Sequence, residues 1–242
     1  MTDTVCAHSR AFIFDCDGTL VRSMGMWIEL GPQVLADYGV SVTGDDLARF
    51  ESLSMYGECC AYHDTWGVGN DGDEIYDHMM GLLLERYRTV VPARDGVKDF
   101  LESVKAAGIP MCIATSTPAH AVRCGLSANG LDGYFDVIVT TQDAGASKDH
   151  PDVYDLALDR LCAHEGIAVP DRGDVWVFED ALFGLKSSGS VGYRRVGVYD
   201  YEGRSAREDV RANCEIFVDE FTELDLNRIL SYCCAGGDDA RG

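Results

Sequence analysis

Near its start the chain carries a short apolar run that ends in two acids, with one residue between them: Phe12-Ile13-Phe14-Asp15-Cys16-Asp17-Gly18-Thr19-Leu20. Together with Ala11, these apolar residues predict a buried β-strand over 11–14. Gly18 lets the chain turn where a side chain would clash, and the Thr19 hydroxyl can hold that turn by a hydrogen bond. The pattern therefore predicts a strand with Asp15 and Asp17 at its carboxyl end.

Outward from this strand, two kinds of segment alternate along the chain. Further β-rich runs cover residues 109–114, 135–140, 175–179, 194–199 and 215–218. Amphipathic helical patterns between them cover residues 97–104, ended by Gly108, then 151–164 and a segment that starts near residue 180. This alternation, with almost continuously apolar strands, predicts an α/β fold: a Rossmann-like parallel sheet with helices on both faces.

Residues 23–88 are the exception, because no convincing β-rich run occurs there. Apolar residues keep helical spacing over 27–38 and again over 76–87, while 45–62 gives a weaker helical pattern with an expected break near Gly57. We expect an all-helical cap domain over 23–88, inserted into an α/β core made of 1–22 and 89–242. The small, polar tail over 235–242 is expected to be frayed.

Composition limits the classes of partner. The chain has 242 residues, enough for one large domain or for one domain with a smaller insertion, and its formal net charge is -21. Nucleic acid and anionic membranes both require a basic face, so neither is expected as a partner. An acidic protein that binds phosphate needs local cations, and a metal ion is the usual source.

The ten cysteines do not indicate a disulfide framework. Met1–Arg10 contains no apolar signal segment, and no run is long enough to span a bilayer. Cys16 and Cys112 lie inside apolar, strand-like runs, where a reduced and buried thiol is expected. These features predict a reducing, cytoplasmic setting.

Polar side chains follow several of the predicted strands at the point where each strand ends. The first strand ends in Asp15, the second in Thr115-Ser116 and the fourth in Glu179-Asp180, while the loop after the third carries Lys148. In an open parallel sheet, ligands bind beyond the carboxyl ends of the strands. We therefore expect these carboxylates, hydroxyls and the ammonium to converge on one edge of the sheet.

A carboxylate at the end of a buried strand costs desolvation energy unless a cation accompanies it, and neighbouring carboxylates add repulsion. A divalent cation removes the conflict, and a set of oxygen ligands indicates Mg²⁺ rather than zinc. The expected ligands are a carboxylate oxygen of Asp15, the backbone carbonyl of Asp17 and a carboxylate oxygen of Asp180. Glu179 is the remaining candidate, and it can either join this metal set or hold the site by hydrogen bonds alone.

With a metal present, Asp15 can serve as a covalent nucleophile towards phosphorus. Mg²⁺, Lys148 and the Thr115 hydroxyl would neutralise the transferring phosphoryl group, and the backbone N–H groups of Cys16, Asp17 and Ser116 could join them. Asp17 is placed to protonate the leaving oxygen and later to deprotonate water. Thr117-Pro118 has the pattern of a helix N-cap followed by proline, which predicts a helix N-terminus directed at the site.

The acidic run resembles the first motif of the haloacid dehalogenase superfamily, and three later segments resemble the remaining motifs in family order. Those segments are Ile113-Ala114-Thr115-Ser116, Ser147-Lys148-Asp149-His150-Pro151-Asp152-Val153-Tyr154 and Val177-Phe178-Glu179-Asp180-Ala181-Leu182-Phe183-Gly184. The resemblance covers most of the chain and implies that Thr115 binds phosphate, that Lys148 clamps it, and that Glu179 and Asp180 form the acidic pair. The helical insertion is similar to the cap of the phosphoglycolate phosphatase and β-phosphoglucomutase branch.

One detail of the resemblance bears on the activity, and two departures from the family pattern touch no chemical role directly. Dehalogenases of this superfamily lack an aspartate at the position of Asp17, so its presence implies phosphoryl chemistry. Arg22 stands where the family commonly has aspartate, at the expected cap hinge. Lys148-Asp149-His150-Pro151 replaces the family's Lys-Pro-x-Pro.

The resemblance implies a Mg²⁺-dependent phosphomonoesterase that acts on a small phosphorylated metabolite through an aspartyl-phosphate intermediate, as a monomer or homodimer. A β-phosphoglucomutase-like sugar phosphomutase is the alternative, because it uses the same phosphoenzyme and nothing in the motifs excludes it. A signalling receiver domain shares the acceptor aspartate, hydroxyl and lysine. Receivers are much shorter, however, lack the helical insertion and place their acceptor on a later strand.

Overall fold

The computed structural model describes residues 11–50 and 53–235. The chain forms two compact units, of which the first contains Met1–Arg22 and Ala93–Gly242 and the second contains Ser23–Pro92. The predicted tail over 235–242 lies outside the described residues apart from Ala235, which ends the last helix. Among the described residues, no helix combines the length and the apolar character needed to cross a membrane.

The first unit is built on a six-stranded parallel sheet with the order β3-β2-β1-β4-β5-β6. The strands are β1 (Ala11–Phe14), β2 (Met111–Thr115), β3 (Ile138–Thr140), β4 (Val175–Glu179), β5 (Arg194–Val198) and β6 (Ile216–Val218). The strand order reverses at β1, which pairs with β2 on one side and β4 on the other. Such a reversal is where open α/β sheets bind their ligands.

The predicted α/β fold class and all six predicted strands are confirmed, with later starts for β2 and β3. β2 starts after Pro110 because proline has no N–H to donate to the ladder. The Pro110 carbonyl still accepts a hydrogen bond from the Phe12 N–H at 2.9 Å. Before β3, Phe135 is already extended after the 3₁₀ turn over Asp132–Tyr134, but pairing with β2 begins only at Ile138. The register places Phe14 opposite both Ile113 and Phe178, so Asp15 comes level with Glu179 at the end of β4.

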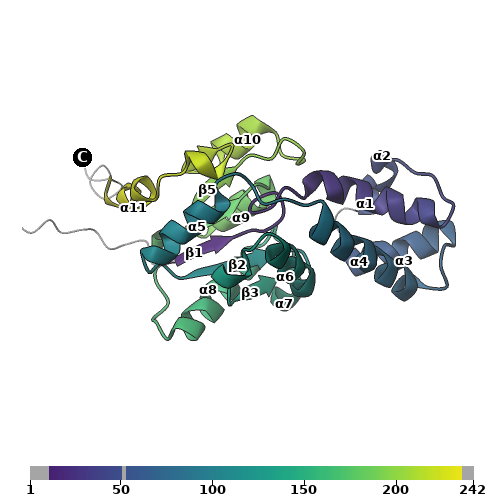
Figure 1. Cartoon of the computed structure of the whole chain (residues 1–242), viewed down its shortest axis with the longest axis horizontal. Helices are drawn as coiled ribbons and strands as arrows, with labels where there is room; N and C mark the ends of the chain where they lie inside the picture. The colour runs from purple at the N-terminus through teal and green to yellow at the C-terminus, as the bar shows by residue number, and fades with distance from the viewer. Residues whose placement is uncertain (1–10, 51–52, 236–242) are drawn as a thin grey trace, which may run out of the picture. The chain divides into compact units, whose positions relative to one another are not determined.

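Helices cover both faces of the sheet, as Figure 1 shows. The helices of this unit are α5 (Val97–Ala106), α6 (Ala119–Ala128), α7 (Thr141–Ala144), α8 (Asp152–Glu165), α9 (Leu182–Ser190), α10 (Arg207–Ala212) and α11 (Leu226–Ala235). Successive residues of β1 point to opposite faces. Ile13 joins the core cluster built with α8, while Phe12 stacks at 6.5 Å on Phe100 of α5, so the two faces of one strand anchor two helices.

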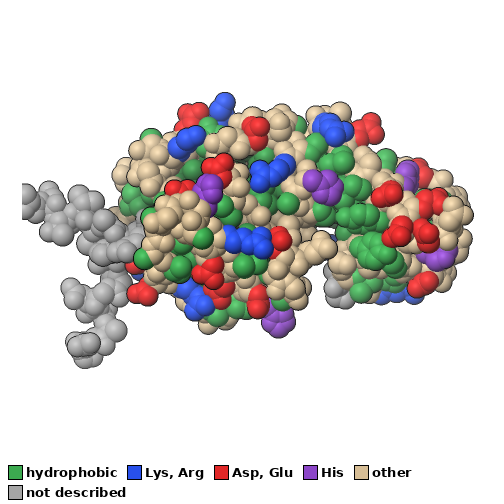
Figure 2. Space-filling view, turned by 90° about the horizontal axis from the view of Figure 1, so that it is seen from below, with side chains coloured by type: hydrophobic (Ala, Val, Ile, Leu, Met, Phe, Trp, Pro, Cys, Tyr) green, Lys and Arg blue, Asp and Glu red, His purple; other side chains and the backbone are tan. Residues whose placement is uncertain are grey.

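Among its described residues, the second unit contains helices and connecting loops but no strand. It contains α1 (Met24–Asp37), α2 (Gly44–Leu47), a 3₁₀ turn over Ala48–Phe50, α3 (Met55–Trp66) and α4 (Gly72–Thr89). Hydrogen bonds from Tyr38 to Glu74 and from Arg86 to the Met26 carbonyl tie α1 to α4. On the face seen in Figure 2, hydrophobic side chains of this unit (right) gather between acidic ones.

Two expected boundaries in this unit differ from the structure. The break expected near Gly57 is wrong, because Gly57 lies in the first turn of α3, where its N–H donates to the side chain of the N-cap Ser54 at 3.1 Å. Among the described residues, the break instead includes Leu53 and Ser54, neither of which is helical. The unit also ends at Pro92 rather than at residue 88, since α4 continues to Thr89 before the chain returns to the sheet.

Close packing of α3 on α4 generates a stability prediction. A Cβ placed on Gly72 would lie 3.0 Å from the Cα of Cys60, whereas a Cβ on Gly81 of the same helix meets nothing within 4 Å. We expect Gly72→Ala to lower the free energy of unfolding by about 1–3 kcal/mol through overpacking. The matched Gly81→Ala should raise it by about 0.5–1 kcal/mol, because alanine loses less backbone entropy than glycine in a helix. Urea unfolding followed by circular dichroism checks both, and equal stability of the two variants would contradict the packing.

Candidate active site

The polar residues predicted to converge do so at the carboxyl edge around β1. Asp15 follows β1, Thr115 ends β2, and Glu179 ends β4 with Asp180 directly after it. Lys148 enters from the loop between α7 and α8. All five residues are buried, each at most 6% exposed.

Lys148 links two of the carboxylates directly. Its Nζ donates to Asp15 Oδ1 and, at 2.9 Å, to Glu179 Oε1. Burial lowers the pKa of the Lys148 ammonium, but Asp15 and Glu179 raise it by more, so this pKa lies well above its ordinary value. The side chain is therefore a fixed positive charge between the ends of β1 and β4.

Glu179 is held at both of its carboxylate oxygens. Oε1 accepts from Lys148 and from the Tyr154 hydroxyl at 2.9 Å, and Oε2 accepts the backbone N–H of Asp180 at 3.0 Å. A Cβ on Gly184 would overlap Glu179 Oε1, so glycine is required there. Tyr154 is a site residue that the sequence patterns did not single out, because its position on α8 predicts only a core side chain.

The site contains more buried negative charge than positive charge. Among residues 11–50 and 53–235, the buried charged side chains are four carboxylates and two cations: Asp15, Glu179, Asp180, Asp200, Lys148 and Arg94. Arg94 pairs with Asp200 at 2.8 Å, as Lys148 pairs with Asp15 and Glu179. Two negative charges remain without a cation, which is the charge that one divalent metal ion would neutralise.

This excess changes the acidity of the carboxyl groups. Burial, followed by repulsion from Glu179, raises the pKa of Asp15 to about 8, although Lys148 opposes the change. Burial and the charges of Glu179 and Asp15 also raise the pKa of Asp180 well above its ordinary value. A bound cation would reverse both directions, because it stabilises the ionised form.

The geometry fits such a cation. Asp15, Glu179 and Asp180 each offer a carboxylate oxygen, and these three oxygens lie within 4.8 Å of one another. Oxygen-only donors suit a hard cation such as Mg²⁺ or Ca²⁺. The side chain of Asp17 is not among these three, and the expected contribution of its backbone carbonyl stays a prediction.

Two threonines orient the surrounding acids. The Thr117 hydroxyl donates to Asp17 Oδ2 at 2.7 Å, and the Thr117 N–H donates to Thr115 Oγ1 at 3.1 Å. The Thr19 hydroxyl donates to Asp180 Oδ1 at 3.3 Å, which links the turn after β1 to the end of β4. Sequence reasoning gave Thr19 a role within its own turn and missed this longer connection.

The predicted N-cap role of Thr117 is wrong. Helix α6 begins at Ala119 with Pro118 in the N-cap position, because the Thr117 hydroxyl is used by Asp17. The two remaining predicted phosphate contacts differ in exposure, since Ser116 is exposed whereas Cys16 is buried. Burial, followed by the charges of Asp17 and Asp15, raises the pKa of the Cys16 thiol, so this thiol stays protonated.

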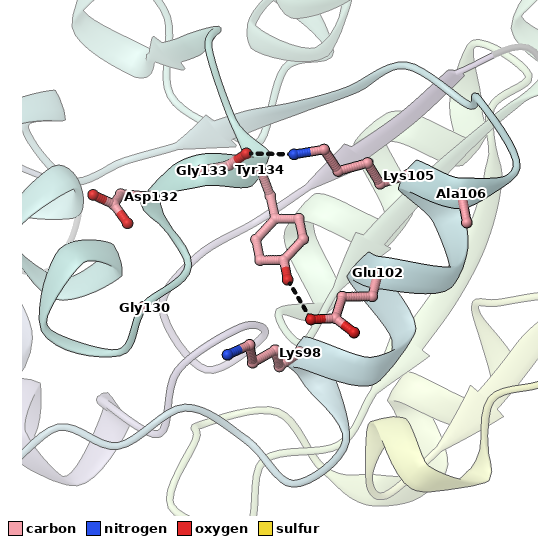
Figure 3. A pocket seen from close by; sticks show the side chains of 8 residues that line it. All are labelled: Lys98, Glu102, Lys105, Ala106, Gly130, Asp132, Gly133 and Tyr134. Atoms are coloured by element: carbon pink, nitrogen blue, oxygen red, sulfur yellow. Dashed lines mark hydrogen bonds between the residues drawn. The ribbon is translucent and has the colours of Figure 1, made fainter.

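A hollow of about 600 Å³ lies on a different part of the same unit, between α5 and residues 130–134 (Figure 3). Two of its polar contacts join lining residues to one another: Lys105 donates to the Gly133 carbonyl at 3.2 Å, and Tyr134 donates to Glu102 at 3.1 Å. The lining segments lead into the amino ends of β2 and β3. The hollow is therefore separate from the carboxylate site, which lies at the opposite edge of the sheet.

Comparison with known proteins gives consistent matches. Residues 12–198 match the haloacid dehalogenase-like hydrolase family. A phosphorylated carbohydrates phosphatase from Thermotoga maritima is 30% identical over 77% of this chain and 83% of its own length. Hexitol phosphatase B from Escherichia coli is 26% identical over 89% of this chain and 96% of its own. A crystal structure of CbbY from Rhodobacter sphaeroides in complex with phosphate has a TM-score of 0.73 at 21% identity, covering 89% of this chain and 96% of that one.

The raised pKa of Asp15 predicts how stability depends on pH when chelator has removed metal ions. Between the ordinary value of 3.8 and about 8, the folded protein retains a proton that the unfolded chain releases. Stability should therefore fall as pH rises through this window, with a slope from this group of up to about 1.4 kcal/mol per pH unit. Urea unfolding between pH 5 and pH 8 should show a shallower slope for Asp15→Asn. Parallel profiles for the two proteins would contradict the raised pKa.

Proposed function

Because the chain belongs to the haloacid dehalogenase-like hydrolase family and is a phosphatase like its named relatives, we propose that it hydrolyses a small phosphorylated metabolite through an aspartyl-phosphate on Asp15. The observation that carries the proposal is the buried group of Asp15, Lys148, Glu179 and Asp180, which has two uncompensated negative charges when all four groups are counted as ionised. Ion pairs that served only to stabilise the fold would leave no such excess of negative charge.

Mg²⁺ is the proposed cofactor. Asp15, Asp180 and the backbone carbonyl of Asp17 would hold the ion, with Glu179 beside them, since the oxygens of Asp15, Glu179 and Asp180 already lie close together. Mg²⁺ keeps several waters and takes few protein carboxylates, so a sparse set of ligands is sufficient. When bound, the ion would neutralise charge on the phosphate and keep Asp15 ionised.

Asp15 is the proposed nucleophile. A carboxylate oxygen of Asp15 attacks phosphorus, the bond between phosphorus and the ester oxygen breaks, and an aspartyl-phosphate forms. Lys148 fixes the orientation of the Asp15 carboxylate and lies next to the position of the transferring phosphate. Thr115, Ser116 and the backbone N–H groups of Cys16 and Asp17 complete the proposed phosphate contacts.

Asp17 is the proposed acid and base. It is partly exposed, unlike the acids of the buried group, and Thr117 holds one of its oxygens. In the first step Asp17 gives its proton to the leaving oxygen. In the second step it takes a proton from the water that attacks the aspartyl-phosphate, which returns Asp15 and releases phosphate.

The helical unit, Ser23–Pro92, is the proposed cap and the proposed source of specificity. The named relatives act on phosphorylated carbohydrates and hexitol phosphates, which makes phosphorylated sugars and polyols the first substrates to test. These relatives are phosphatases, so we favour transfer to water over the phosphomutase reaction. A cytoplasmic setting accords with the buried thiols of Cys16, Cys59, Cys112 and Cys162.

Substitution of the nucleophile tests this proposal. With Mg²⁺, the protein should release inorganic phosphate from phosphorylated sugars or polyols, and Asp15→Asn should lower kcat by at least about 10⁴-fold, because an amide cannot accept the phosphoryl group. Asp174→Asn, which changes an acid in the 3₁₀ turn before β4, should leave kcat unchanged. A screen ranked by kcat/KM checks the substrate class.

Two results would overturn the assignment. Retained turnover in a folded Asp15→Asn protein would remove Asp15 as the nucleophile. Interconversion of β-glucose 1-phosphate and glucose 6-phosphate without release of phosphate would identify a mutase instead.

A further inference from the structure

Arg94 is a buried arginine that the proposed chemistry does not use. It lies two residues after Pro92, where the chain returns from the helical unit, and is only 2% exposed. A guanidinium is always charged, so burying one demands several well-oriented acceptors. The acceptors of Arg94 come from three separate segments of the sheet's carboxyl edge.

The first segment is the turn that carries Asp17. Arg94 Nε donates to the Gly18 carbonyl at 2.7 Å, and the backbone N–H of Arg94 donates to the Leu20 carbonyl at 3.0 Å. Gly18 has a φ of 81°, so this turn uses a conformation that few other residues adopt. Arg94 thus holds two carbonyls of the turn on either side of Thr19.

The second and third segments follow β5 and β6. Arg94 Nη2 donates to Asp200 Oδ2 at 2.8 Å, and Nη1 donates to the Asp219 carbonyl at 3.2 Å. Asp200 and Gly203 belong to one loop, and this loop lies next to Asp180. A Cβ added to Gly203 would lie 3.4 Å from the Asp200 Cβ and 3.6 Å from Asp180 Oδ2. One guanidinium therefore connects the Asp17 turn with the loop beside Asp180.

We propose that Arg94 is a positioning residue for the phosphatase reaction, which sets the place of the Asp17 turn relative to Asp180 without touching the substrate. The proposal rests on the function proposed above, because Asp17 and Asp180 matter only if they act on metal and leaving group. Arg94 also compensates Asp200, and without it the buried site would contain a further uncompensated negative charge. Lysine cannot replace it, because one ammonium group cannot donate to both the Gly18 carbonyl and the Asp200 carboxylate in the plane of each acceptor.

The test compares Arg94→Lys with a matched control, Arg195→Lys. Arg195 is a partly buried arginine of the same unit, with Glu215 as its carboxylate and the Leu185 carbonyl at 3.4 Å, but it lies at the amino end of β5. Both substitutions keep the positive charge and remove the planar guanidinium group with its several N–H donors. A purely structural role of Arg94 predicts similar results for the two variants.

We expect Arg94→Lys to lower kcat by about tenfold, the effect of one lost charge-assisted hydrogen bond, while KM changes less than about threefold. The Mg²⁺ concentration for half-maximal activity should rise by a similar factor. In the absence of metal and substrate, hydrogen exchange measured by mass spectrometry should become faster in peptides covering residues 16–21. Arg195→Lys should show none of these changes. If Arg94→Lys does not fold, Asp200→Asn provides a second variant, which should raise the Mg²⁺ requirement in the same direction.

Equal kcat, Mg²⁺ dependence and exchange in Arg94→Lys and Arg195→Lys would overturn the inference. A wild-type protein without phosphatase activity would refute the proposed function and, with it, the positioning role. Hydrogen exchange would still decide whether Arg94 holds the turn, so the two failures remain distinguishable.

Discussion

The Lys148 ammonium, buried between Asp15 and Glu179, is the interaction on which the site depends. Without it, acids at the ends of two neighbouring strands would repel each other in a dry environment, and the carboxyl edge of the sheet would be costly to form. One lysine offsets only part of this repulsion. The remaining charge is the charge that the proposed divalent cation would neutralise.

The sheet explains why these groups meet. Parallel pairing of β1 with β4 brings Asp15 level with Glu179, and the apolar faces of β1 bind helices on both sides. Phe14 stacks on Phe178 at 4.3 Å, directly beneath the two acids. Packing of the core and placement of the proposed catalytic carboxylates are therefore consequences of one register, and a slip of the strand would disrupt both.

The sequence predicted the parts of the structure that depend on local pattern. Apolar runs predicted all six strands, the positions at strand ends predicted Asp15, Thr115 and Asp180, and the loop after the third strand predicted Lys148. Contacts between distant segments could not be predicted in this way. Tyr154 has the spacing of a core residue on α8, and its hydroxyl gains a role only because Glu179 arrives from β4.

Arg94 and Thr117 illustrate the same point. Arg94 lies 76 residues from the Gly18 carbonyl and 106 from the Asp200 carboxylate that it binds, so no window of sequence contains the interaction. Thr117-Pro118 has a convincing capping pattern, yet the hydroxyl donates to Asp17 instead. The fold therefore decides which partner the Thr117 hydroxyl binds. The helical unit is the proposed source of specificity, and there apolar spacing predicted the helices but carries no information on ligand chemistry.

Divalent-ion binding tests the central claim most directly. Titration with Mn²⁺, followed by electron paramagnetic resonance, should show one ion bound per chain at the buried carboxylates. Asp180→Asn should weaken that binding by at least about tenfold, since it removes one charge from a buried set that exceeds its cations by two. A wild-type chain that binds no ion, or an Asp180→Asn chain that binds it equally well, would contradict the account.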